Sequence, residues 1–259
     1  MESRIDKIMR KTKQSLKREL LYCSPKSRPR KILFDHLPKC GGSTINAYLE
    51  EHYPKRKTFS MDSTHPAESI KRFTDLPERT RYGYELVKGH FAHELVDYVH
   101  PDCLKATVFR EPVDRIISHY FFVRRTPEHY LHSRILETDM SLEEYATSNL
   151  SDELRNWYVT HFTGLGIQDA ERNPEQSVTR ALEVILQQYD IIGFLDDFPA
   201  FAETLRTQAN LRYAFRNKRV NVTTNRPDIR EISESTIRKI RETNHLDIVL
   251  YSKLREARG

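Results

Sequence analysis

The chain has 259 residues, of which 38% are hydrophobic, 10% aromatic and 31% charged. The aromatic content argues against a disordered chain, and 8 Gly with 12 Pro exclude collagen-like and glycine-rich repeats. No stretch approaches the roughly 20 apolar residues of a membrane-spanning helix, and no apolar segment follows the charged N-terminus as in a secretory signal. The three cysteines lie far apart, so we expect neither a disulfide framework nor a cysteine-based zinc site, and a cytoplasmic location.

The positive charge of the chain is concentrated at its N-terminus. Residues 1–30 contain ten Lys or Arg and three Asp or Glu, a balance of +7, whereas residues 31–259 contain 32 and 34, a balance of −2. Such an arm can contact an anionic membrane surface or nucleic acid, but a solvated, partly helical arm explains the composition as well. We therefore expect a basic arm over residues 1–30, open to peripheral membrane contact, and no nucleic-acid function.

The region after the arm begins with a strand, a glycine turn and a helix. Residues 32–34 predict a short buried strand, and residues 38–43 form a turn of small residues. Apolar side chains then recur at the helical spacing i, i+3, i+4 and i+8, at Ile45, Tyr48, Leu49 and Tyr53. This order of elements is typical of a nucleotide-binding α/β unit.

Further strands and helices alternate along the chain. We predict a loop with a short helix over 54–80, strands over 84–87, 104–109 and 189–195, and helices from Pro112 and over 197–209 and 228–256. Residues 126–180 predict a helical insertion, which we expect over the sheet near an acceptor site. The alternation favours an α/β, P-loop-like nucleotide-binding fold with a central parallel sheet flanked by helices.

The first motif that could carry chemistry is the turn 36–44, HLPKCGGST. Its glycines allow backbone N–H groups to converge on an oxyanion, and the start of the next helix adds positive potential. Lys39 adds a point charge, while Ser43 and Thr44 can cap the helix and donate to a phosphate. An ordinary glycine turn with a Ser/Thr cap is the alternative. No Gly-Lys pair is present, which argues against the G-x-x-x-x-G-K-[ST] loop of ATP and GTP hydrolases.

The second motif spans residues 107–120. Arg110 directly follows a predicted strand, where ligands bind in open α/β sheets, and Ser118 lies eight residues further on, inside a predicted helix. An arginine fork suits a terminal phosphate, and a hydroxyl can share that phosphate. In the alternative interpretation, Arg110 pairs with Glu111 or Asp114 and Ser118 faces solvent.

Together, the two motifs resemble those of sulfotransferases that use 3′-phosphoadenosine 5′-phosphosulfate (PAPS), especially the carbohydrate-type branch with the heparan sulfate 2-O-sulfotransferases and bacterial relatives. The turn resembles the 5′-phosphosulfate loop of that family, with Cys40 where Thr is commoner, and residues 110–118 resemble its 3′-phosphate motif. The resemblance covers residues 31 to about 255 and implies a single sulfotransferase domain over 31–259. The residues it implies for donor binding are Lys39, Cys40, Gly41, Gly42, Ser43, Thr44, Arg110 and Ser118.

The segment Lys88–His93, KGHFAH, offers a general base. Histidine has the ordinary pKa that best suits proton abstraction near neutrality. The resemblance implies a base in this segment, with His90 as the better match and His93 as the second candidate. Taken alone, a histidine here is more often structural.

A late basic segment, residues 216–227, resembles the loop that closes over the nucleotide in related sulfotransferases. Within it we select Asn221 and Arg226 as donor-binding candidates, with a basic surface turn as the alternative. Two further groups could contact an acceptor. For the charged set Arg124, Arg125, His129 and His132 the favoured interpretation is a solvated charge run, and for the aromatic pair Trp157 and Tyr158 buried packing of the insertion is an equal alternative.

The resemblance implies in-line transfer of a sulfuryl group from PAPS to a hydroxyl, with a carbohydrate favoured as acceptor. His90 would take the hydroxyl proton, while Lys39 and the turn N–H groups would stabilise the bridging oxygen that departs. We expect no metal, because a sulfuryl group carries less charge than a terminal phosphoryl group. The alternatives are an ATP-dependent, P-loop kinase-like phosphotransferase and a non-catalytic nucleotide-fold binding protein whose arm docks on a membrane or partner.

Overall fold

The computed structural model describes residues 28–216 and 227–258. Most of the basic arm and two of the donor-binding candidates, Asn221 and Arg226, lie outside these residues. The described chain forms two compact units, 28–108 with 189–216 and 109–188 with 227–258. We call them the sheet unit and the helical unit.

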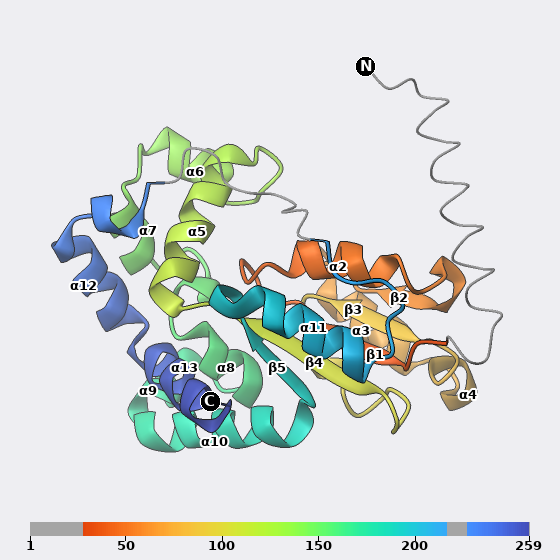
Figure 1. Cartoon of the computed structure of the whole chain (residues 1–259). Helices are drawn as coiled ribbons and strands as arrows, with labels where there is room; N and C mark the ends of the chain where they lie inside the picture. The colour runs from red at the N-terminus through yellow and green to blue at the C-terminus, as the bar shows by residue number, and fades with distance from the viewer. Residues whose placement is uncertain (1–27, 217–226, 259) are drawn as a thin grey trace, which may run out of the picture. The chain divides into compact units, whose positions relative to one another are not determined.

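The sheet has five strands in the order β2-β3-β1-β4-β5 (Figure 1). Their bounds are β1 Ile32–Asp35, β2 Thr58–Ser60, β3 Leu86–Gly89, β4 Leu104–Phe109 and β5 Ile191–Phe194. The β1–β3, β1–β4 and β2–β3 pairs are parallel. Every residue of β1 is buried, as is typical of a parallel strand covered on both faces. The α/β fold with a parallel central sheet is therefore confirmed.

Helices cover both faces of the sheet within its own unit, with α11 in front of the strands and α3 behind them in Figure 1. One face packs through Leu33, Phe59 and Val87 against Phe73 of α3. Against β5 lies α11, so closely that a Cβ on Gly193 would come within 2.1 Å of Phe201. The helices of this unit are α2 Gly42–Glu50, α3 Pro66–Thr74, α4 Glu78–Arg81 and α11 Phe198–Gln208, with short 3-10 turns η2 Lys55–Lys57, η3 Ala92–Leu95 and η5 Leu195–Asp197.

Most predicted elements of the sheet unit are confirmed, with one clear miss. Strands β1 and β4 form where the apolar runs predict them, whereas β3 begins two residues later than expected. The expectation of only a loop and a short helix over 54–80 is wrong, because this segment also contains the edge strand β2. That strand has three residues, and only Phe59 is buried, so its pattern is too short to indicate a strand.

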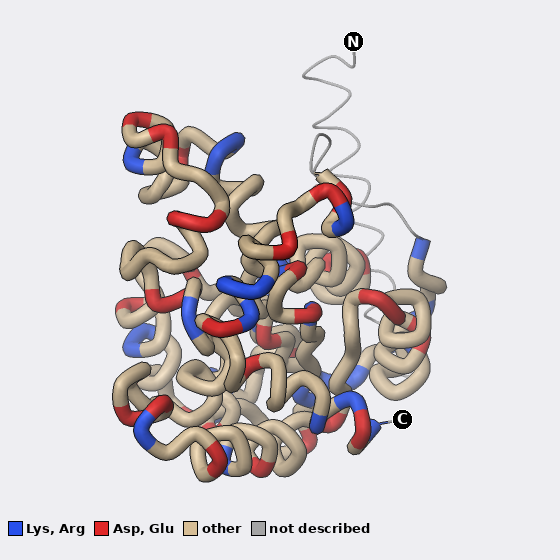
Figure 2. The backbone as a smooth tube through the Cα atoms, turned by 90° about the vertical axis from the view of Figure 1, so that its left-hand side faces the viewer, with Lys and Arg blue, Asp and Glu red and all other residues tan. Residues whose placement is uncertain are grey.

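The helical unit packs around α5, Pro112–Arg125, which begins at the predicted proline. The other helices are α6 His132–Glu137, α7 Leu142–Thr147, α8 Trp157–Thr163, α9 Ile167–Arg172, α10 Pro174–Gln188, α12 Glu234–Thr243 and α13 His245–Arg258, with the short turns η4 Asp152–Leu154 and η6 Ile229–Glu231. Helical structure over 126–180 and 228–256 is thus confirmed. Acidic and basic residues are interspersed along the described backbone (Figure 2).

A buried ion pair joins α5 to α13 and α8. The side chains of Arg115 and Asp247 are fully buried, 3.9 Å apart, and the guanidinium lies over the rings of Trp157 and Tyr158. The Asp247 carboxylate also accepts hydrogen bonds from the backbone N–H groups of Tyr158 and Val159, in the first turn of α8. Burial raises the pKa of Asp247 to about 6, against the opposing effects of Arg115 and these N–H groups.

Candidate active site

The carboxyl ends of β1 and β3 bring two histidines together. The parallel register aligns Asp35 with Gly89, so the next residues, His36 and His90, are neighbours across the sheet edge. The His36 backbone N–H donates to the Gly89 carbonyl at 3.0 Å, which continues the ladder. The two imidazole rings stack with centroids 4.2 Å apart and planes at 26°. His90, the candidate base, is therefore held directly beside the turn that starts after β1.

The turn after β1 has the backbone of an anion-binding loop. Lys39 and Gly41 have φ of 64° and 80°, both in the left-handed region, and α2 starts at Gly42. Left-handed residues within a turn orient successive N–H groups toward a common centre, and the first N–H groups of a helix have no partner within the helix. Together these features fit a phosphate or sulfate group.

The two glycines of this turn are also required by packing. A Cβ on Gly41 would lie 2.7 Å from Leu195, and a Cβ on Gly42 would lie 1.8 Å from the His36 ring. Only glycine lets the start of α2 approach His36 so closely. The turn and the histidine pair are therefore one packed assembly within the sheet unit.

The expected capping by Ser43 and Thr44 is wrong. The helix starts at Gly42, so the cap position falls on Gly41, which has no side chain. Ser43 is exposed and Thr44 is half-buried in the first helical turn. The Cys40 side chain is fully buried, its thiol donates to the Pro38 carbonyl at 3.4 Å, and its backbone N–H donates to the Leu37 carbonyl at 3.3 Å.

His36 is enclosed by polar and apolar neighbours. Its Nδ1 lies 3.1 Å from Asn46 Nδ2, one turn into α2, and Gly42 lies against the ring edge. Burial, followed by the neighbouring His90, lowers the pKa of His36 to about 3. The imidazole is therefore neutral at physiological pH. The sequence places His36 shortly after the first predicted strand, but only the register of β1 and β3 brings it opposite His90.

A buried network fixes the backbone of the residues that follow His90. The Asp35 carboxyl group is fully buried and accepts hydrogen bonds from the His93 backbone N–H at 3.2 Å and the Tyr189 hydroxyl at 3.1 Å. The same hydroxyl lies 3.2 Å from His93 Nδ1, and the two rings are stacked. The network anchors the start of η3, just after Phe91, whose φ is 63°. Sequence reasoning missed Asp35 and Tyr189, because Asp35 lies 58 residues from His93 and 154 residues from Tyr189.

The second motif lies in the helical unit. Arg110 follows β4, and its backbone N–H and carbonyl both bond to the Tyr158 hydroxyl, at 3.2 and 2.9 Å. Its side-chain Nε donates to Asp114 one helical turn away, so the pairing of the alternative interpretation is present. Ser118 is 4% exposed, so it does not face solvent. The sequence gives no indication that Tyr158 holds Arg110.

The residues considered for acceptor contact make contacts with other residues of the helical unit. Arg124 donates to the Tyr120 hydroxyl at 2.7 Å, and His132 Nδ1 lies 2.8 Å from the Val123 carbonyl. Trp157 and Tyr158 are buried at 5% and 0% exposure, so their packed alternative is the one observed.

Two general properties concern the described residues alone. The helices of residues 28–216 and 227–258 fall short of the length and apolar character that a bilayer span needs. Within the same residues, His, Cys, Asp and Glu side chains form no group of three or more that could hold a metal ion.

Comparison with known proteins adds a family assignment to this geometry. The model of the sulfotransferase family matches residues 26–253, which include the turn after β1, both histidines and the Arg110–Ser118 motif. Comparison with curated proteins gives no match. The match extends over most of the chain and supports sulfuryl transfer to an acceptor as its activity. On this evidence the chain belongs to the sulfotransferase family.

Proposed function

We propose that the protein transfers a sulfuryl group from PAPS to a hydroxyl group of a carbohydrate. The observation that carries the proposal is the placement of His90 against the turn after β1: its ring stacks on His36, which in turn contacts Gly42 at the start of α2. A side chain suited to proton abstraction thus lies beside backbone suited to an anionic group. The carbohydrate acceptor is supported by the resemblance alone.

In this proposal the turn holds the 5′-phosphosulfate through the backbone of Gly41, Gly42 and Ser43, with the Thr44 hydroxyl as a further donor. Lys39 places its ammonium near the bridging oxygen, where negative charge grows as the sulfur–oxygen bond breaks. When bound, PAPS supplies the sulfuryl group and departs as 3′-phosphoadenosine 5′-phosphate (PAP).

His90 accepts the proton of the attacking hydroxyl. The register of β1 and β3 fixes its backbone, and the Asp35–Tyr189–His93 network fixes the residues that follow it. His93, whose Nδ1 lies 3.2 Å from the Tyr189 hydroxyl, remains the second candidate.

Arg110 and Ser118 are proposed to bind the 3′-phosphate of the same nucleotide. The Tyr158 hydroxyl holds the Arg110 backbone, and Asp114 holds its Nε, which together limit the directions the guanidinium can take. A pre-oriented fork loses less entropy on binding a phosphate. Recognition of this group would select PAPS over ATP, which lacks it.

Calorimetric titration of the full chain with PAP, ATP and ADP, without added metal, tests the donor. We expect binding of PAP alone, loss of that binding in Arg110→Ala, and retained binding with lost turnover in His90→Ala. A preference for ATP with magnesium would overturn the proposal in favour of a phosphotransferase. An unchanged PAP dissociation constant in Arg110→Ala would overturn the role of that residue.

Sulfation assays with radiolabelled PAPS then test the acceptor. The panel should contain sulfated and unsulfated polysaccharides, a tyrosine peptide and a small phenol. Transfer to a polysaccharide is the expected result. Transfer to the peptide or the phenol alone would overturn the carbohydrate assignment and leave the donor assignment intact.

A further inference from the structure

His36 lies half-buried beside the candidate base and has no role in the proposed transfer itself. The inference drawn from it rests on the proposed function. We propose that His36 is a positioning residue for His90: its ring is a fixed aromatic surface that holds the His90 imidazole in the orientation that accepts the hydroxyl proton. The stacked geometry, the packing of His36 on α2 and the strand register carry the proposal.

The His36 ring is held on several sides. Its backbone N–H bonds to the Gly89 carbonyl, one residue before His90. The start of α2 lies against its edge at Gly42, and Asn46 lies within hydrogen-bond distance of Nδ1. A side chain held in this way has few alternative rotamers, so the face that it turns to His90 is a constant surface. The backbone contacts of His90 do not fix the plane of its ring, whereas stacking on the His36 ring does.

The charges around His36 support the same role. The titratable groups that influence the pKa of His36 are His90, Asp35 of β1, Lys88 of β3 and Lys39 of the turn. Lys88 is itself nearly buried and paired with Glu50 of α2 at 3.0 Å. Burial dominates and lowers the pKa of His36 to about 3, so the ring does not compete with His90 for the proton.

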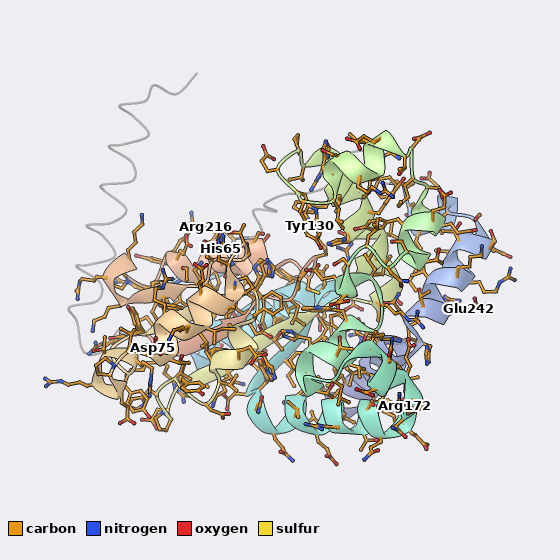
Figure 3. All side chains as sticks on the ribbon, turned by 180° about the vertical axis from the view of Figure 1, so that it is seen from behind. His65, Asp75, Tyr130, Arg172, Arg216 and Glu242 are labelled. Atoms are coloured by element: carbon orange, nitrogen blue, oxygen red, sulfur yellow. The ribbon has the colours of Figure 1, made fainter. Side chains whose placement is uncertain are left out.

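Three variants of the full chain separate this role from others. His36→Phe keeps an aromatic face without a titratable group, and His36→Ala removes the face. The control is His65→Ala, which removes an exposed histidine of the same unit (Figure 3). We expect kcat to fall at least tenfold in His36→Ala, and to stay within about threefold of the unmodified protein in His36→Phe and His65→Ala. PAP affinity should change less than threefold in all three.

A pH profile and NMR distinguish positioning from a merely structural contact. The acid limb of the kcat profile should move in His36→Ala and stay in place in His36→Phe. In the ligand-free protein, the ring resonances of His90 should change chemical shift and titration midpoint in His36→Ala. Equal kcat values in His36→Ala and the unmodified protein, or unchanged His90 resonances, would overturn the inference. Equal losses in His36→Phe and His36→Ala would also overturn it, because they would make the imidazole itself essential.

Failure of the proposed function has a different signature. If PAP does not bind the unmodified protein, the sulfotransferase proposal fails, and the positioning role fails with it. If PAP binds and His90→Ala loses turnover while His36→Ala does not, only the inference about His36 fails.

Discussion

The two units of the molecule bury their polar groups in different ways. In the sheet unit, polar side chains at the ends of strands contact one another, as in the hydrogen bond of Tyr189 to Asp35 and the stack of His36 on His90. In the helical unit, a charged pair, Arg115 and Asp247, is buried between helices. Strand register places the first set, and packing between distant helices places the second. The difference predicts where each unit is vulnerable.

The largest effect should follow Asp247→Ala in the helical unit. The substitution leaves Arg115 as an uncompensated buried charge and removes the acceptor of two N–H groups of α8. Breaking one side of a buried pair costs about 3–5 kcal/mol in the free energy of unfolding. Denaturant unfolding measures it, with Asp169→Ala, in an exposed pair with Arg172, as the control. A loss no larger than that of the control would show that the buried pair is not what holds these helices together.

A smaller effect is expected at the start of α2. Gly42→Ala places a Cβ 1.8 Å from the His36 ring, so either the ring or the helix must shift. Overpacking of this kind costs about 1–3 kcal/mol, and we expect PAP affinity to fall at least tenfold. Gly166→Ala is the matched control, because its Cβ would have its nearest neighbour 4.0 Å away. Normal PAP binding by Gly42→Ala would show that PAP binding does not depend on the packing of the turn against the histidine pair.

Acid should weaken the sheet unit through His36. The folded pKa of about 3 lies below the ordinary value of 6.5, so the unfolded chain binds more protons between these values. The contribution of His36 to stability is complete above pH 6.5 and is lost as the pH falls toward 3. By pH 5 the loss is about 2 kcal/mol. Unfolding titrations at pH 7.5 and 5 should show a smaller acid loss in His36→Phe. An equal loss of unfolding free energy in both proteins would show that groups other than His36 cause the acid sensitivity.

The smallest effect belongs to an exposed ion pair of the helical unit. Lys239 of α12 and Glu143 of α7 form a contact across the two helices, but both side chains are substantially exposed. Water and salt screen such pairs, so Lys239→Ala should leave the unfolding midpoint unchanged at high ionic strength. A clear loss at high salt would mean that exposed charges, and not the buried pair alone, organise these helices.

The sequence allowed more to be predicted about the sheet unit than about the helical unit. Apolar runs and glycines indicate strands and turns locally, so β1, β4 and the turn between β1 and α2 were predicted correctly. The short edge strand β2 was missed, because three residues with one buried side chain give no usable period. The helices of the helical unit were predicted, but the contacts that hold them were not, since Asp247 and the N–H groups it accepts from are almost 90 residues apart.

The candidate site shows the same division. Lys39, the glycines and His90 were selected from local patterns and from the resemblance. The contact of His90 with His36 follows from the register, which becomes known only when strand pairing is known. Tyr189 and Asp35 could not be paired from the sequence, and the engagement of Arg110 with Tyr158 was equally hidden. Local patterns therefore identified candidate chemistry, while long-range pairing determines how the groups are held.

The buried thiol of Cys40 gives the turn a chemical property of its own. Oxidants and alkylating reagents attack an exposed thiolate, and this thiol is fully covered and turned toward the Pro38 carbonyl. A reagent therefore reaches it only when the turn opens. In a protein with Cys23 replaced by serine, the alkylation rate of Cys40 therefore measures how often the turn opens. Burial raises the pKa of Cys103 to about 12, so this second thiol serves as a slowly reacting internal reference. A nucleotide that occupies the turn would lower the alkylation rate of Cys40, so binding could be detected without any assay of catalysis.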